Sequence, residues 1–163
     1  MLTASRDIIR RLEREGWKLV RVTGSHHVFK SPGSDQTLVI PHPKKDLGKG
    51  LVRAILGVRA GSPIETAMTH YVAITEDAGP DHAIGVWFPD LPGCTSGGDD
   101  IDEALRNAPE ALELYAEGLY EDGQPLPRAR TQTELKADPE VAEDIDANMV
   151  ALIELRAPAH AAE

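Results

Sequence analysis

Residues 17–40 read WKLVRVTGSHHVFKSPGSDQTLVI, and this stretch decides the fold of the first part of the chain. Three runs rich in β-branched and aromatic residues, 17–23, 26–30 and 36–40, alternate with the turn sequences Gly24-Ser25 and 31–35. Short runs of this kind, separated by Gly, Ser, Pro and Asp, are typical of strands joined by tight turns. The pattern therefore predicts an antiparallel three-stranded meander.

Helical patterns flank the three predicted strands. Residues 5–15 begin with Ser5 and Asp7, then repeat apolar side chains at helical spacing before Gly16. Residues 48–56 show the same spacing and also end at a glycine. Acidic starts and glycine stops are signals of helix ends. The order helix, three strands, helix predicts an α+β unit in which two helices cover one sheet face.

A run of breakers divides the chain. Residues 57–63 read GVRAGSP, and a new alternating pattern begins soon afterwards. Helix stops followed by Gly, Ser and Pro mark the end of a unit. We expect a first unit at residues 1–62, a linker at 63–67, a second unit at 68–155 and a flexible tail at 156–163.

The second unit also has an α+β pattern. Strands are predicted at residues 71–77, 83–88, 94–97 and 149–155, with a long helix starting after Asp99 or Asp100 and a short helical stretch before the last strand. Pro109 falls inside the long helix pattern. Because an internal proline removes a hydrogen bond and crowds the preceding turn, we expect the helix to bend or restart there.

Charge separates the two units more sharply than any motif. Residues 1–62 carry 12 Lys or Arg against 5 Asp or Glu, a net charge of +7. Residues 63–163 carry 5 against 22, a net charge of −17. A basic unit suits a polyanion such as nucleic acid, and an acidic unit attracts the basic one. The charge pattern predicts that the two units bind each other.

Several classes of protein are not expected from this composition. The single cysteine, Cys94, permits no internal disulfide, and no Cys/His cluster has the spacing of zinc ligands. We therefore expect no metal and no cofactor. Neither a secretory signal nor an apolar run long enough to cross a bilayer is present in the sequence, so a cytoplasmic location is expected, with no membrane role.

Four motifs of the first unit carry a family resemblance. They are Gly16-Trp17, Gly24-Ser25-His26-His27, residues 40–47 (IPHPKKDL) and residues 49–56 (KGLVRAIL). In this order they resemble the HicA family of messenger-RNA interferases from residue 5 to about residue 59. The resemblance implies a double-stranded-RNA-binding-like fold, metal-independent cleavage of mRNA, and a catalytic role for the second histidine of the motif, His27.

The chemistry of RNA cleavage assigns roles to these residues. A histidine that titrates near neutral pH suits removal of the ribose 2′-hydroxyl proton, which makes His27 the candidate catalytic group. Neighbouring residues of a strand face opposite sides, so one histidine of the pair should point toward the helices. We expect that residue to be His26, with a structural role. The candidates for RNA binding are Gly24, Ser25, Lys44, Lys45 and Lys49.

The second unit resembles a partner family. Residues 88–94 (FPDLPGC), followed by Ser96-Gly97 and an acidic helix start, are similar to the HicB antitoxin family, and the similarity runs from residue 71 to about residue 155. It implies a partial RNase H-like fold and an inhibitor that covers the toxin site. Asp77 and Asp90 are the candidate inhibitory contacts. No DNA-binding motif follows residue 155, so operator binding is not expected.

The sequence thus predicts an mRNA endoribonuclease toxin that a fused acidic antitoxin unit holds inactive. Three alternatives stay open: a noncatalytic RNA-binding regulatory module in which His27 only contacts RNA, an interaction protein with no RNA role, and a two-metal carboxylate site built from acidic residues of the second unit. The sequence also leaves open whether inhibition occurs in cis or in trans and whether the chain forms a homo-oligomer.

Overall fold

The computed structural model describes residues 4–33, 35–44, 46–57 and 70–156. The first unit has the predicted order of one helix, three strands and one helix. Its elements are α1 (Ser5–Arg14), β1 (Lys18–Thr23), β2 (His26–Lys30), β3 (Thr37–Pro41) and α2 (Lys49–Leu56). The strands form an antiparallel sheet in the order β1-β2-β3, which confirms the predicted meander.

The second unit adds four strands and three helices within the described residues. They are β4 (His70–Glu76), β5 (Ile84–Trp87), β6 (Thr95–Gly98), α3 (Ile101–Glu121), α4 (Gln132–Lys136), α5 (Pro139–Ala147) and β7 (Met149–Glu154). Asp100 begins α3 by accepting a hydrogen bond of 2.8 Å from the Glu103 amide. The helix continues through Pro109, so the expected restart is wrong. Buried Ala108, Ala111 and Leu112 pack on both sides of the proline and hold the helix against the sheets.

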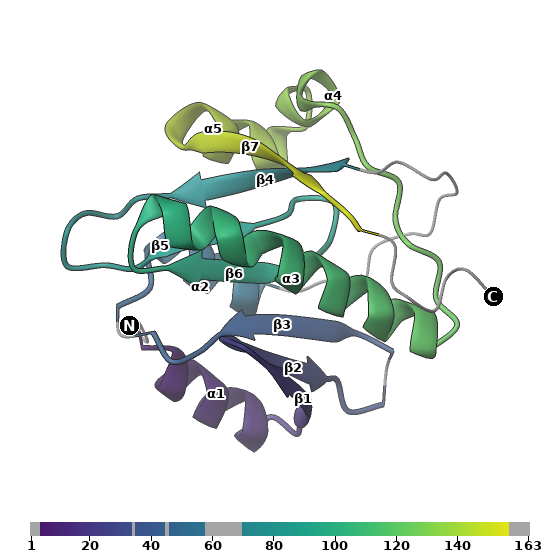
Figure 1. Ribbon diagram of the computed structural model, residues 1–163. Helices are drawn as coiled ribbons and strands as arrows, with labels where there is room; N and C mark the ends of the chain where they lie inside the picture. Colours follow the sequence, from purple (N-terminus) through teal and green to yellow (C-terminus); the bar gives the residue numbers. More distant parts are fainter. Residues whose placement is uncertain (1–3, 34, 45, 58–69, 157–163) are drawn as a thin grey trace.

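The two sheets lie side by side at β3 and β6 (Figure 1). The second sheet is antiparallel in the order β6-β5-β4-β7. A parallel bridge pairs Val39 with Cys94, and the Val39 amide donates a 2.7 Å hydrogen bond to the Gly93 carbonyl. The two predicted units therefore meet strand to strand, and the helices cover the combined layer.

Both hydrophobic cores draw on both units. On the α3 side, Val28 and Val39 of the first unit join Leu112 and other residues of the second unit. On the α1 and α2 side, Leu51 and other residues of the first unit join Trp87 of the second. The predicted linker and the part of the predicted tail after residue 156 lie outside the described residues. The units consequently share their cores, although their sequences divide cleanly.

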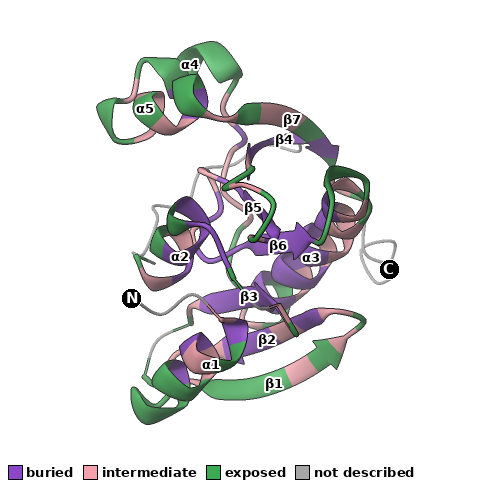
Figure 2. Cartoon of the chain, turned by 90° about the vertical axis from the view of Figure 1, so that its left-hand side faces the viewer, coloured by how far each residue is buried: buried purple, intermediate pink, exposed green. Residues whose placement is uncertain are grey.

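Burial increases from the outer strand to the middle of the molecule. Figure 2 shows β1 largely exposed at one edge and β3 buried beside β6. The exposed apolar residues of β1 are Leu19, Val20 and Val22. In the part of the chain that the structure describes, no helix combines the length and the apolar character that crossing a membrane requires.

Candidate active site

The two neighbouring histidines of β2 face opposite sides of the sheet. His26 is fully buried on the face that α3 covers, together with Val28. His27 points to the other face, on which Phe29 packs in the α1-side core. The expectation that His26 points toward the helices of its own unit is wrong: His26 faces α3 of the second unit, and His27 lies on the face that α1 covers.

Both ring nitrogens of His26 bind residues of the second unit. Nδ1 lies 2.7 Å from Oε1 of Glu110 on α3, and Nε2 lies 2.8 Å from Oγ of Ser96 on β6. Burial lowers the pKa of His26, against the opposing effect of Glu110. In the neutral ring, Nδ1–H donates to the carboxylate and Nε2 accepts from the serine hydroxyl. No ring nitrogen remains for a substrate while the second unit is in place.

Gly24 brings the turn before β2 close to the same carboxylate. Its φ of +53° is a left-handed conformation that favours glycine. A Cβ atom at this position would lie 2.8 Å from Oε1 of Glu110. Glycine is therefore favoured by the turn, and a side chain at this position would displace the carboxylate end of Glu110.

His27 has different neighbours. Its ring lies edge-on to that of His42, with 4.6 Å between centroids. Burial lowers the pKa of His27, and within the described residues its buried Nδ1 has no hydrogen-bond partner. His42 Nδ1 lies 2.8 Å from Oγ of Ser5, at the start of α1. None of these contacts involves the second unit.

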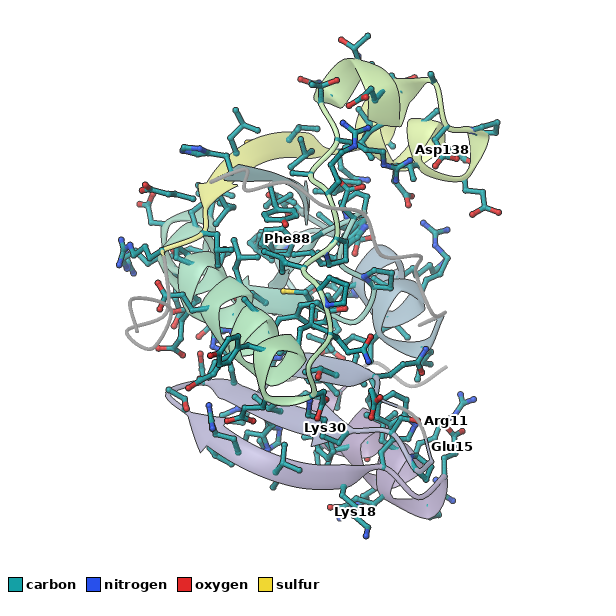
Figure 3. The ribbon with its side chains drawn as sticks, turned by 90° about the vertical axis from the view of Figure 1, so that its right-hand side faces the viewer. Arg11, Glu15, Lys18, Lys30, Phe88 and Asp138 are labelled. Atoms are coloured by element: carbon teal, nitrogen blue, oxygen red, sulfur yellow. The ribbon has the colours of Figure 1, made fainter. Side chains whose placement is uncertain are left out.

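Two cations lie on the same face as His26. Arg21 forms an ion pair with Glu117 and a second, at 3.0 Å, with Glu121. Lys30 pairs with Asp122 and donates a 2.9 Å hydrogen bond to the Gly118 carbonyl. Figure 3 shows Lys30 between the first sheet and the C-terminal end of α3.

Lys44, just after β3, extends this basic surface to the start of α3. Its Nζ lies 3.0 Å from Oδ1 of Asp99 and 3.3 Å from Oε2 of Glu103. The side chain is only 8% exposed. Burial by itself would lower the pKa of Lys44, but the hydrogen bonds to Asp99 and Glu103 outweigh it and raise the pKa. The amine is thus held in its charged form.

The predicted RNA-binding residues do not all come together. Gly24 and Lys44 lie on the surface that the second unit covers. Ser25 lies in the turn, where its carbonyl accepts a 2.7 Å hydrogen bond from the His42 amide. Lys49 is the exposed first residue of α2, and Lys45 lies outside the described residues.

The expected inhibitory carboxylates bond within their own unit instead. Oδ1 of Asp77 accepts a 3.0 Å hydrogen bond from the Gly79 amide in the turn after β4. Asp90 accepts two hydrogen bonds of 2.6 Å from Arg130. The Asp90 side chain is only 6% exposed, and a carboxylate so deeply buried requires a positive partner. The carboxylates of α3 and its N-terminal segment contact the first unit in their place.

A further carboxylate, Glu76 of β4, binds the N-terminus of α2. Its two oxygens accept hydrogen bonds of 2.9 and 3.1 Å from the amides of Gly50 and Leu51. Unpaired amides at a helix N-terminus attract anions. The second unit supplies its own anion at this position.

Sequence reasoning missed the residues that make most of the contacts, namely Arg21, Lys30, Ser96, Glu110 and Glu117. The regular spacing of the glutamates in α3 was a sequence signal that this helix presents a row of carboxylates on one side. Within the described ranges, no group of three or more His, Cys, Asp or Glu side chains is placed to hold a metal ion.

Two family models match the chain. Residues 5–60 match the HicA toxin of bacterial toxin–antitoxin systems. Residues 70–159, more than half of the chain, match the HicB-like antitoxin of bacterial toxin–antitoxin systems. The two matches follow one another in the sequence without overlap.

Individual relatives match shorter stretches. A 14.9 kDa protein of Haemophilus phage HP1 is 48% identical over 44 residues, which cover 27% of this chain and 33% of that protein. A UPF0150 protein of Synechocystis is 50% identical over 48 residues, covering 29% of this chain and 61% of the relative. A UPF0150 protein of Thermoplasma acidophilum is 38% identical over 61 residues, covering 37% and 86%. The chain thus spans less than two thirds of the first two relatives.

Solved structures of related proteins are similar over about half of the chain. The Burkholderia pseudomallei antitoxin HicB has 31% identity and a TM-score of 0.46, with 55% of this chain and 65% of that one covered. A HicA3 and HicB3 toxin–antitoxin complex contains a chain with 24% identity and a TM-score of 0.44, covering 53% of this chain and 98% of that one.

Proposed function

Because this chain belongs to the HicB-like antitoxin family and carries a HicA toxin unit ahead of that part, we propose that its first unit is an mRNA-cleaving endoribonuclease kept inactive by the second. The two families make the chain a toxin–antitoxin module. One observation carries the inhibitory part of the proposal: His26 is fully buried and both of its ring nitrogens bind the second unit.

The covered histidine is a better candidate for the catalytic group than its neighbour. An inhibitor that acts by occlusion must cover the reactive side chain, and α3 covers His26 while His27 faces α1. Arg21, Lys30 and Lys44 surround the same face with positive charge. We therefore assign the catalytic role to His26 in place of His27, which the family resemblance had suggested.

When the second unit is removed, the first unit presents the groups that metal-independent cleavage requires. Neutral His26 takes the proton of the ribose 2′-hydroxyl, and the 2′-oxygen then attacks the adjacent phosphorus. The bond to the 5′-oxygen breaks as that oxygen takes up a proton from solvent water, which leaves a 2′,3′-cyclic phosphate on one product and a 5′-hydroxyl on the other. His26 then returns its proton to the solvent. Nearby cations stabilise the negative charge of the transition state. The need for a 2′-hydroxyl makes RNA the substrate rather than DNA.

Inhibition combines occlusion with charge competition. Glu110 and Ser96 occupy the histidine, and acidic residues of α3 neutralise the cations around it. The covalent connection keeps the inhibitor at a high effective concentration. The order α1-β1-β2-β3-α2, with one sheet face left to a partner, supports a double-stranded-RNA-binding-like fold for the first unit. The sheet and long helix of the second unit support a partial RNase H-like fold.

Separate expression of the units tests this function. Residues 1–62 are induced in growing cells alone, or together with residues 63–163 from a second gene, and RNA integrity and growth are followed. We expect RNA loss and growth arrest only without the second unit. The substitution His26→Ala should abolish both effects, and His27→Ala should retain them.

Three results would decide against parts of the proposal. Persistent cleavage by the His26→Ala variant would overturn the catalytic assignment. Cleavage by the intact chain at the rate of residues 1–62 would overturn the inhibition. Intact RNA that still binds to a folded first unit, checked by circular dichroism, would favour the alternative of a noncatalytic regulatory module.

A further inference from the structure

A regular row of carboxylates on α3 faces the first unit. Glu103, Glu110 and Glu117 follow one another at intervals of seven residues. At about 3.6 residues per turn and 1.5 Å per residue, this spacing keeps them on one side of the helix, about 10.5 Å apart. They contact, in turn, Lys44, His26 and Arg21. Glu121 and Asp122 continue the row to Arg21 and Lys30.

The basic partners of these carboxylates share one face of the first sheet. The register places Arg21 of β1 opposite Val28, which lies between His26 and Lys30 at alternate positions of β2. Side chains at alternate positions of a strand point the same way. Lys44 follows β3. The positive row is therefore assembled from separate segments by strand pairing, and no single basic run of sequence produces it.

Attachment of the second unit does not by itself require this charge. Val28 and Val39 already give the face apolar contacts with Leu112 and its neighbours. The cost of removing charges from water largely offsets the gain from pairing them, so apolar residues would attach the units as well. Binding of a polyanion, however, requires cations that become exposed when the second unit leaves.

We propose that α3 imitates the phosphate backbone of RNA, and that Arg21, Lys30 and Lys44 form a track for the phosphates of the RNA strand that reaches His26. The inference rests on the proposed function of the first unit. Carboxylate and phosphate oxygens accept the same charge-assisted hydrogen bonds from Arg and Lys. RNA and α3 therefore compete for the same side chains, and each excludes the other.

This competition can be measured with a chain that a protease has cut between its two units. A protease site is inserted between residues 57 and 70, and the purified chain is cut so that the two fragments remain as a complex. A 2′-O-methyl oligoribonucleotide, which lacks the attacking hydroxyl, is titrated in, and release of the acidic fragment is followed by energy transfer between labels. The RNA concentration at half release reports the ratio of the two affinities.

Substitutions on the two sides of the interface should shift this concentration differently. Glu117→Gln with Glu121→Gln weakens only the attachment of α3, so half release should need about tenfold less RNA. The control Glu113→Gln changes the same helix outside this row and should leave the concentration unchanged. Arg21→Gln with Lys30→Gln weakens both interactions, so the concentration should stay within about threefold of wild type or rise.

Two results would overturn the track. A tenfold fall with the Arg21 and Lys30 pair, like that with the glutamate pair, would mean that these cations serve α3 alone. Failure of the oligonucleotide to release the fragment from the wild type would mean that RNA and α3 do not compete. Cleavage of unmodified RNA, measured separately after dilution of the cut complex, tests the proposed function, so the two can fail independently.

Discussion

The two faces of the β1-β2-β3 sheet are closed in different ways. On the α1 face, Phe29, Leu38 and Ile40 pack against the helices of the same unit in an apolar core. On the α3 face, Val28 and Val39 give apolar contacts, but Arg21 and Lys30 form ion pairs across the unit boundary. Both cores include residues of the second unit, but the α3 face also brings cations of the first unit against carboxylates of the second.

The difference explains why adjacent histidines have such different surroundings. His27 lies against His42 of its own unit, whereas both ring nitrogens of His26 form hydrogen bonds with the second unit. A face made wholly of large apolar residues would promote aggregation whenever the second unit dissociated from it. Basic side chains remain soluble when uncovered and can then bind a polyanion. Under the proposed function, we expect substitutions on the α1 face to change stability and those on the α3 face to change inhibition as well.

The largest effect should come from the α1 face. Phe29 is fully buried, so Phe29→Ala should lower the free energy of unfolding by about 3–5 kcal/mol through lost burial and a cavity. We also expect residues 1–62 carrying this change to be harmless in cells, because the toxin unit no longer folds. Urea unfolding of the intact chain measures the first effect, with Leu19→Ala on exposed β1 as control. A stability loss below that of the control would contradict the assignment of the core.

A smaller effect is expected where α3 approaches β3. A Cβ atom at Gly118 would lie 2.9 Å from Oγ1 and 3.1 Å from Cγ2 of Thr37. Gly118→Val should therefore separate the units and cost about 1–3 kcal/mol by overpacking. In cells, the intact variant should become toxic, the opposite of the Phe29→Ala result. Tyr120→Ala, at an exposed position of the same helix, should remain harmless. A non-toxic, fully stable Gly118→Val chain would show that this contact is not needed for inhibition.

Local sequence patterns predicted most of the elements. The first three strands are within one residue of the predicted starts and ends, because β-branched runs and Gly-rich turns act locally. The uninterrupted α3 could not be foreseen, since Pro109 argues against a helix and only packing of the residues around it decides the outcome. The shared cores were also beyond the sequence, which gives no position of one unit relative to the other.

The site was predicted less well than the fold. Alternation along β2 correctly separates His26 from His27, but the sequence does not say which face a partner covers. Asp90 was chosen because it lies in a conspicuous loop, whereas its burial directs it to Arg130. The ion pairs of Arg21 and Lys30 span 92 to 100 residues of sequence, a separation that no local pattern encodes. Charge asymmetry predicted that the units bind, but not through which residues.

A still smaller effect on stability is expected from the hydrogen bond between His26 and Glu110. Glu110→Gln keeps an oxygen that can accept the Nδ1–H bond but removes the charge, so we expect a loss of about 0.5–1.5 kcal/mol in stability. The corresponding change Glu113→Gln alters the same helix without touching His26 and should cost less. Urea unfolding of both variants at the same pH gives the comparison. Equal losses would mean that the charge of Glu110 contributes nothing specific to the covered histidine.

The smallest effect should be a pH dependence that separates the two faces. Burial holds the pKa of His26 below its ordinary value of 6.5, with Glu110 opposing and Lys44 assisting. The folded state therefore favours the neutral ring, and unfolding takes up a proton when the pH is below 6.5. Stability from this group is complete above that pH and is lost as the pH falls through the lowered pKa, by at most about 1.4 kcal/mol per pH unit. His27 and His42 contribute in the same direction from the α1 face.

The stability of both His26→Gln and His27→Gln should therefore depend less on pH between pH 7.5 and 5.5 than the stability of the wild type. Only His26→Gln should also remove the pH dependence of RNA-driven fragment release. An unchanged release profile in His26→Gln would place the titrating group elsewhere.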